Sequence, residues 1–270
     1  MSEERSDSLP VPGASLYYEV RGSGPTLLII HGGAEDADGF KSIANQLADS
    51  FTVVTYDRRG YSRSRLDDPA EDQNLATQSD DAHRLLAALC TEPAYVFGSS
   101  AGAFIGLDLV ARHPAQVRLL IAHEPPVWQL LPDAEQFLIS AKILETYRHE
   151  GEKVALRQFA ACAGIVAGEW EPDVTPPQRS PLAAGNPEFF LTKEASEIER
   201  YVFDLPALKV ASTRIVPAGG NESRGYFTFR CAAALSNVLG TSVAEFPGHH
   251  AGYRNMPKAF AQRLREILDA

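Results

Sequence analysis

The sequence predicts an α/β protein in which helices cover both faces of a mostly parallel sheet. Short apolar segments typical of buried strands alternate with amphipathic helical segments from Leu16 onward. One long interval, residues 125–211, interrupts this alternation with helical segments but no convincing strand. A chain of 270 residues with 44% hydrophobic residues suits one such domain with an insertion.

Seven segments have the composition expected of strands. The first resembles one strand of a hairpin, and the other six resemble buried strands of the central sheet. They are residues 16–21, 26–30, 51–56, 94–97, 118–122, 214–217 and 242–246. The helices expected between and after them are residues 39–48, 75–90, 101–112, 229–239 and 257–268.

The interval 125–211 is interpreted as a helical cap inserted into the sheet. Its expected helices are residues 133–149, 152–163 and 187–203. The proline-rich stretch 171–187 is expected to be a connecting loop. The predicted organisation is therefore a core of residues 1–124 and 212–270 with a cap at 125–211. An insertion between strand ends lies over the carboxyl edge of the sheet, where ligands bind in such folds, so we expect the cap to shape a substrate pocket.

Composition excludes several classes of function. The formal net charge of −10 and the lack of a basic run argue against binding to nucleic acid or to an anionic membrane. Three cysteines are too few for a disulfide framework, which favours a reducing compartment. The polar N-terminus lacks the apolar core of a signal peptide, and no segment is long enough to span a bilayer. We therefore expect a cytoplasmic protein that acts on a small molecule.

Residues 98–102 (GSSAG) match the G-x-S-x-G pattern of a serine nucleophile. An apolar strand precedes the pattern and a helical run follows it, so a sharp strand-to-helix turn is expected at Ser100. A catalytic serine needs such an exposed position, a nearby base and donors for oxyanion charge. Alone, the pattern also fits a glycine-rich turn with Ser100 as a helix N-cap. The remaining site features therefore carry the prediction of a serine hydrolase.

Two loops at strand ends supply a base and an oxyanion donor. The C-terminal loop carries His249 and His250, which point in different directions because they are adjacent, so one of them is expected to reach Ser100. The other loop begins with His31, interpreted as a structural hydrogen-bonding residue, and continues with two glycines that let backbone approach a bound carbonyl. The amides of Gly33 and Ala101 are the expected oxyanion donors.

Two carboxylates could orient the histidine. Glu124 follows the strand expected at 118–122, and Glu222 follows the next strand along the chain. Because both lie at strand ends, spacing does not separate them. A basic loop between the second and third central strands, with arginines at 58, 59, 63 and 65, is interpreted as a solvated or salt-bridged surface feature rather than an anion site.

Taken in order, these landmarks resemble the α/β-hydrolase fold superfamily over nearly the whole chain from Leu16. They are residues 31–33 (HGG), 56–64 (YDRRGYSRS), 98–102 and 112–114 (RHP), the cap and the terminal histidine loop. The resemblance favours His250 over His249, since in this family the base follows a short glycine-containing turn and precedes a small residue. Residues 122–126 (AHEPP) are similar to the segment that carries the catalytic glutamate of zearalenone lactonases. Those enzymes open a macrocyclic lactone with a Ser-Glu-His triad, which favours Glu124.

The expected reaction is acyl transfer on an ester or lactone. Ser100 attacks the carbonyl, His250 takes its proton, Glu124 orients the imidazolium, and water then releases the acyl group. No metal or organic cofactor is required. A cofactor-free perhydrolase or haloperoxidase, a carbon–carbon bond hydrolase and a ligand-binding protein of the same fold stay open as alternatives. Ser100 argues against haloalkane dehalogenases and epoxide hydrolases, which attack through a carboxylate.

Overall fold

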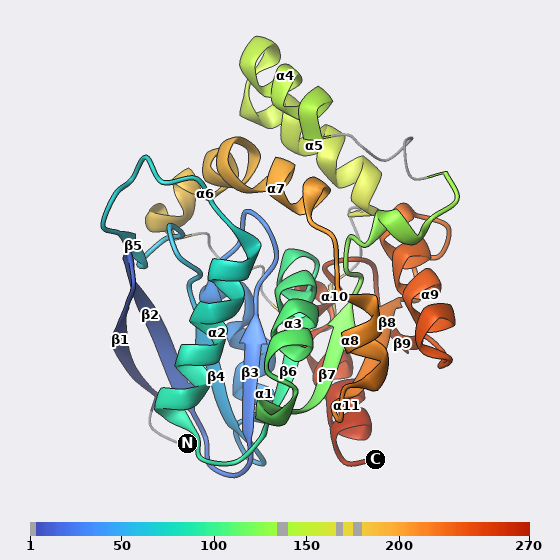
Figure 1. The fold of residues 1–270 in the computed structure, drawn as a ribbon. Helices are drawn as coiled ribbons and strands as arrows, with labels where there is room; N and C mark the ends of the chain where they lie inside the picture. Colours follow the sequence, from blue (N-terminus) through green and yellow to red (C-terminus); the bar gives the residue numbers. More distant parts are fainter. Residues whose placement is uncertain (1–3, 134–139, 166–169, 175–179) are drawn as a thin grey trace.

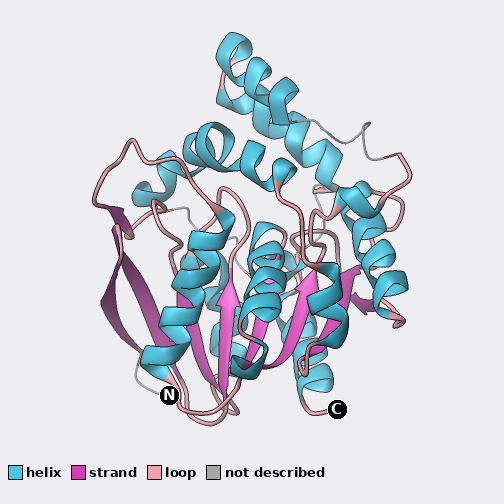
Figure 2. Ribbon diagram, in the orientation of Figure 1, coloured by secondary structure: helices cyan, strands magenta, loops and turns pink. Residues whose placement is uncertain are grey.

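The structure is a computed structural model that describes residues 4–133, 140–165, 170–174 and 180–270. Its strands are β1 (Arg5–Val11), β2 (Ala14–Arg21), β3 (Thr26–Ile30), β4 (Thr52–Tyr56), β5 (Arg65–Leu66), β6 (Ala94–Ser99), β7 (Val117–His123), β8 (Arg214–Gly220) and β9 (Ala244–Phe246). They form one sheet in the order β1-β2-β4-β3-β6-β7-β8-β9, with β5 paired to β2. All neighbours from β4 to β9 are parallel, whereas β2 is antiparallel to its partners. The mostly parallel sheet predicted from the sequence is confirmed (Figure 2).

Helices cover both faces of this sheet (Figure 1). The helices of the described residues are α1 (Lys41–Leu47), α2 (Leu75–Leu89), α3 (Ala101–Arg112), α4 (Ser140–Glu150), α5 (Glu152–Ala163), α6 (Asn186–Phe189), α7 (Ala195–Arg200), α8 (Leu205–Val210), α9 (Phe227–Leu239), α10 (Gly252–Asn255) and α11 (Pro257–Leu268). Of these, α4 to α7 lie above the sheet rather than on its faces. Helices α2 and α3 pack against each other on one face, and α1 and α11 pack against each other on the other.

Alternate residues of the buried strands supply two separate cores. In β3, Leu28 and Ile30 belong to the cluster beneath α2 and α3, while Leu27 and Ile29 belong to the cluster beneath α1 and α11. This division follows from the two-residue period of a strand, which sends successive side chains to opposite faces. A strand that is apolar at every position therefore marks a sheet buried on both sides.

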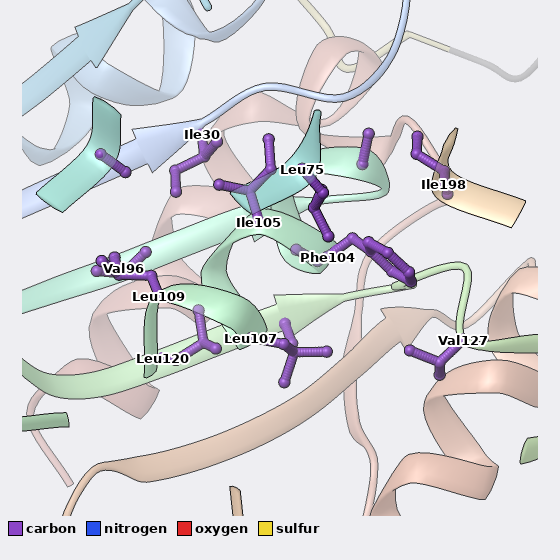
Figure 3. Packing of buried hydrophobic residues seen from close by; sticks show 14 of the residues in the cluster. Ile30, Leu75, Val96, Phe104, Ile105, Leu107, Leu109, Leu120, Val127 and Ile198 are labelled. Atoms are coloured by element: carbon purple, nitrogen blue, oxygen red, sulfur yellow. The ribbon is translucent and has the colours of Figure 1, made fainter. Parts of the chain in front are cut away.

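Helix α3 lies in the centre of the first core. Its residues Ile105 and Leu109 lie in one buried cluster with Val96 of β6 and Leu120 of β7 (Figure 3). The helix is apolar almost all round, as expected of a helix covered by sheet on one side and by other helices on the other. This packing fixes the position of the residue from which α3 starts.

Two strands were not expected from the sequence. The seven predicted strands are all found, the one at 26–30 with the predicted bounds and the other six with shifted ends, but β1 and β5 are additional. Strand β1 lies at the edge of the sheet, is mostly exposed and contains Pro10, so it lacks the alternation of apolar residues that marks a half-buried strand. Strand β5 has two residues, which is too short for any periodicity to show.

The segment between β7 and β8 contributes helices above the carboxyl ends of the parallel strands (Figure 1). The helix expected at 187–203 is found as one continuous run from α6 to α7, but Phe190–Glu194 in its middle form a π-helical turn and it ends at Arg200. Helix α8, not expected from the sequence, packs against α3 beside the sheet. Residues 134–139 of the helix expected at 133–149, and residues 175–179 of the expected loop 171–187, lie outside the described residues.

The start of α3 lies in very close contact with the end of β3. A Cβ atom built on Gly102 would lie 2.0 Å from the carbonyl oxygen of Ile30, a backbone atom that cannot move aside easily. A Cβ atom on Gly106, one turn further along α3, would lie 2.7 Å from a methyl carbon of Leu120, which belongs to a flexible side chain. Only the first glycine is therefore required by backbone contact.

We predict that Gly102→Ala lowers the free energy of unfolding by about 2–3 kcal/mol, because the new methyl group forces the helix and strand apart. Gly106→Ala serves as the matched control and is expected to change it by less than about 1 kcal/mol, since better helix propensity offsets the crowding at Leu120. Urea denaturation followed by circular dichroism measures both values. Equal effects of the two substitutions would contradict the prediction.

Candidate active site

Ser100 lies in a strained turn between β6 and α3. Its backbone has φ 54° and ψ −119°, a conformation that residues other than glycine adopt only when the surrounding structure imposes it. The Ser100 N–H donates to the carbonyl of His123 at 2.9 Å, which ties the turn to the neighbouring strand. A Cβ atom on Gly98 would lie 2.4 Å from the carbonyl oxygen of Gly102, so the flanking glycine allows the chain to turn this sharply. The turn expected from the GSSAG pattern is present.

Glu124 and His250 are joined by a hydrogen bond within the protein. His250 Nδ1 donates to Glu124 Oε2 at 2.6 Å, and the N–H of Gly220 donates to Glu124 Oε1 at 2.8 Å. The Glu124 side chain is fully buried, and that of His250 is 5% exposed. Because both carboxylate oxygens are bound, Glu124 holds the histidine ring in one orientation.

The charge of Glu124 is stabilised by its partner. Burial acts to raise the pKa of Glu124, but the hydrogen bond and the charge of His250 outweigh it and place the pKa at about 2. The carboxylate is therefore ionised at neutral pH. With Nδ1 donating to it, neutral His250 carries its proton on Nδ1 and leaves Nε2 able to accept one.

The alternative residues make other contacts. Glu222 is exposed, and its backbone N–H donates to the carbonyl of Gly248 at 3.0 Å. His249 Nδ1 accepts from the N–H of Ala251 at 3.1 Å, and its Nε2 lies 3.2 Å from the side-chain amide of Asn255. Burial lowers the pKa of His249. His249 therefore holds the shape of the loop, and the pair that the structure brings together is Glu124 and His250.

The loop after β3 places Gly32 beside Ser100 and Gly33 in the lining of the same cavity. A Cβ atom on Gly32 would lie 3.2 Å from Cβ of Ser100, and one on Gly33 would lie 2.3 Å from the ring of Phe190. Within the part of the chain that the structure describes, neither the Gly33 N–H nor the Ala101 N–H donates to a protein acceptor. Both amides expected as oxyanion donors are thus available to a ligand next to Ser100.

Ser100 borders two cavities. The larger has a volume of about 360 Å³, lies beneath α5 of the inserted segment, and is also lined by Gly32, Gly33 and His250. The smaller, about 60 Å³, is lined mainly by apolar side chains, among them Trp128, Phe190 and Phe227, together with Ala101. A group bonded to Ser100 would therefore lie between a larger cavity of mixed lining and a smaller one that is almost wholly apolar.

Comparison with known proteins identifies the family of the chain. A family model described as alpha/beta hydrolase fold matches residues 25–160. The uncharacterized hydrolase YraK of Bacillus subtilis (strain 168) is 46% identical over 271 residues, covering 97% of this chain and 95% of that protein. The chain belongs to the α/β-hydrolase fold family. This hydrolase therefore has the family membership that the resemblance of its motifs implied.

Two further proteins are similar to this α/β-hydrolase. The zearalenone hydrolase of Bionectria ochroleuca is 32% identical over 117 residues, which cover 42% of this chain and 44% of that protein. The crystal structure of a hydrolase from Pseudomonas aeruginosa PA01 superposes with a TM-score of 0.73 at 20% identity, covering 98% of each chain. The second similarity concerns the fold alone.

The first part of the basic loop after β4 is buried, whereas Arg65 further along it is exposed. The interpretation of its arginines as surface residues is wrong for Arg58 and Arg59, which are 1% and 2% exposed. Arg58 forms an ion pair with Glu194 of the inserted segment, and Arg59 Nε bonds Asp81 Oδ2 of α2 at 2.6 Å. Sequence patterns gave no signal for Glu194, because its partner lies 136 residues away along the chain.

His31 has the structural role expected of it. Its Nδ1 donates to the carbonyl of Gly32 at 2.7 Å, and its Nε2 accepts from the backbone N–H of Arg58 at 3.0 Å. Burial and the charge of Arg58 lower the pKa of His31 well below its usual value, so the ring is neutral. His31 therefore joins the loops after β3 and β4.

Neither a metal site nor a membrane span is found in the described residues. No group of three or more His, Cys, Asp and Glu side chains among them is arranged to hold a metal ion. None of the helices in the described ranges is long and apolar enough to cross a membrane.

We predict a pH-dependent contribution of Glu124 to stability. A carboxyl group whose pKa falls from 4.5 to about 2 on folding stabilises the protein above pH 4.5, and this stabilisation is lost as the pH falls towards about 2. The stability difference between wild type and Glu124→Gln, measured by urea unfolding, should therefore be largest at neutral pH and shrink below about pH 4.5. The exposed Glu222→Gln is the control, and the prediction fails if both variants show the same pH dependence.

Proposed function

We propose that this hydrolase cleaves carboxylic esters or lactones by acyl transfer through Ser100. The observation that carries the proposal is the hydrogen bond between Glu124 and His250 at a cavity that Ser100 and His250 both line. A nucleophile, a base and a group that orients the base are the three members of a serine catalytic triad. The strained turn adds support, since it aims the serine at the cavity and places the N-terminus of α3 beneath it.

In the proposed mechanism each residue has one role. Ser100 Oγ attacks the substrate carbonyl while Nε2 of His250 accepts its proton, and buried Glu124 stabilises the resulting imidazolium. The N–H groups of Gly33 and Ala101 donate to the oxyanion, each contributing a factor of about 10²–10³ to the rate. His250 then returns the proton to the leaving alcohol, and a water activated by the same histidine releases the acid.

The two cavities support a substrate with unlike sides. Attack at Ser100 places the acyl and alcohol portions on either side of the carbonyl, and the cavities that border Ser100 differ in size and polarity. In a lactone both portions belong to one ring, so the ring would occupy both cavities. A macrocyclic lactone of the zearalenone type is the narrowest substrate that we propose, supported by the AHEPP segment at 122–126 and the partial similarity to a zearalenone hydrolase.

Covalent labelling tests the nucleophile. A fluorophosphonate probe is expected to label the wild-type protein at one site, and Ser100→Ala should abolish labelling because the probe reacts only with an activated serine. Ser99→Ala, which changes the buried neighbour in the same motif, should retain it. Mass spectrometry of the labelled peptide identifies the residue, and modification elsewhere in a folded wild-type protein would overturn the proposal.

The rate of fluorophosphonate labelling distinguishes the two candidate acids, Glu124 and Glu222. Glu124→Gln should slow labelling by about 10²-fold or more, since His250 loses the partner that fixes its tautomer. Glu222→Gln should leave the labelling rate within about twofold, because its exposed side chain lies outside the Glu124–His250 hydrogen bond. The reverse order would assign the role to Glu222.

A substrate panel tests the class of substrate. We expect hydrolysis of short-chain aryl esters and a higher kcat/KM for a macrocyclic lactone such as zearalenone, because only the large ring fills both cavities. Long-chain esters complete the panel, and Ser100→Ala is the control for background hydrolysis. Activity confined to small esters would exclude the macrolactone as substrate but keep the proposal of an esterase. No hydrolysis of any ester or lactone would contradict the proposed class of reaction.

A further inference from the structure

Two side chains donate hydrogen bonds to the carbonyl of Gly32. His31 Nδ1 donates to it at 2.7 Å, and Arg58 Nη2 donates to it at 2.9 Å. No cis peptide bond occurs among the described residues, so the Gly32 carbonyl and the Gly33 N–H point in opposite directions across one planar unit. The groups that hold the carbonyl therefore also set the direction of the Gly33 N–H, on the side of the cavity.

Arg58 is itself held by buried partners. Its guanidinium bonds both carboxylate oxygens of Glu194 and the side-chain oxygen of Gln78, and lies 4.5 Å from the centre of the Tyr61 ring. The hydroxyl of Tyr61 donates to the same carboxylate. Arg58 and Glu194 are each 1% exposed. A charge buried to this degree must keep its partner, so the pair has one stable arrangement.

Glu194 belongs to the inserted segment, at the end of the π-helical turn Phe190–Glu194. The same turn also contacts the loop after β3 through Phe190, whose ring packs directly on Gly33. Nearby, the Asn186 side chain donates to the carbonyl of Glu35 at 3.0 Å. The inserted segment thus contacts the loop after β3 directly on the cavity side. Through the ion pair of Glu194 with Arg58, it is also linked to the Gly32 carbonyl.

We propose that Arg58 is a positioning residue for the oxyanion hole. Because Glu194 is its ion-pair partner, the direction of the Gly33 N–H then depends on the position of the inserted segment. The inference rests on the proposed function, because it assigns a supporting role within that mechanism. An amide that points at the developing oxyanion stabilises the transition state more than the bound substrate. Loss of the Arg58 contact therefore lowers kcat and leaves KM nearly unchanged.

The test replaces the ion pair by an apolar pair of similar volume. The double variant Arg58→Met/Glu194→Met leaves no unpaired buried charge and removes the guanidinium donor to Gly32. We expect kcat for an aryl ester to fall about 10–100-fold, somewhat less than for deletion of an oxyanion donor, with KM within about threefold. Affinity for a trifluoromethyl ketone, whose adduct places an oxyanion in the same position, should fall by the same factor.

The chain offers a matched control. Arg59 and Asp81 form a neighbouring buried ion pair that contacts neither Gly32 nor the inserted segment in the described residues. Arg59→Met/Asp81→Met should therefore leave kcat, KM and inhibitor affinity within about twofold of wild type. Circular dichroism and thermal unfolding report whether each variant is folded.

Each outcome decides for or against the inference. Unchanged kcat in the Arg58/Glu194 variant, an effect on KM alone, or an equal fall in kcat in the two double variants overturns it. If the apolar variant does not fold, Arg58→Lys replaces it. Lysine keeps the charge beside Glu194 but lacks the planar guanidinium fork that spans the carboxylate and the Gly32 carbonyl, so kcat should still fall about tenfold. Unchanged kcat in that variant also overturns the inference. Failure of the proposed function is seen separately, as absence of fluorophosphonate labelling in wild type.

Discussion

The contact between the first turn of α3 and the end of β3 is the constraint on which the site depends. At Gly102 the helix backbone lies so close to the carbonyl of Ile30 that no side chain fits between them. Parallel pairing of β3 with β6 brings the two strand ends level. Gly32 and Ser100, which follow the two strands, are consequently neighbours although 68 positions separate them in the sequence. The packing of α3 between sheet and outer helices holds this contact closed.

The parts of the site that the sequence predicted are those encoded within a few residues. Ser100 between two glycines, the paired glycines after β3 and the histidine loop near the C-terminus each follow an apolar strand directly. A buried strand is easily found from its composition, and its carboxyl end then locates the side chain. The same argument could not choose between Glu124 and Glu222, because both satisfy it. The choice became visible only in three dimensions, where the Glu124 carboxylate meets the His250 ring.

The features that the sequence did not predict depend on distant partners. An arginine after a strand is usually exposed, and nothing near Arg58 reveals that Glu194 covers it. The π-helical turn that carries Glu194 was hidden in the same way, because residues 187–203 have the periodicity of one uninterrupted helix. Edge strand β1 was not predicted for the opposite reason, because its mostly exposed residues show no alternation of apolar and polar side chains. Contacts between residues far apart in the sequence therefore could not be predicted from local sequence patterns.

The buried pair of Arg58 and Glu194 also bears on how such a chain could be remodelled. Loops over the carboxyl edge of α/β proteins are commonly treated as exchangeable parts that can be grafted from one scaffold onto another. Here the scaffold contributes a cation that is only 1% exposed, and the graft contributes the only acid among its described ion-pair partners. A transplanted segment without a carboxylate at this position would leave an isolated charge in the interior. Recombination between relatives should therefore exchange the two residues together.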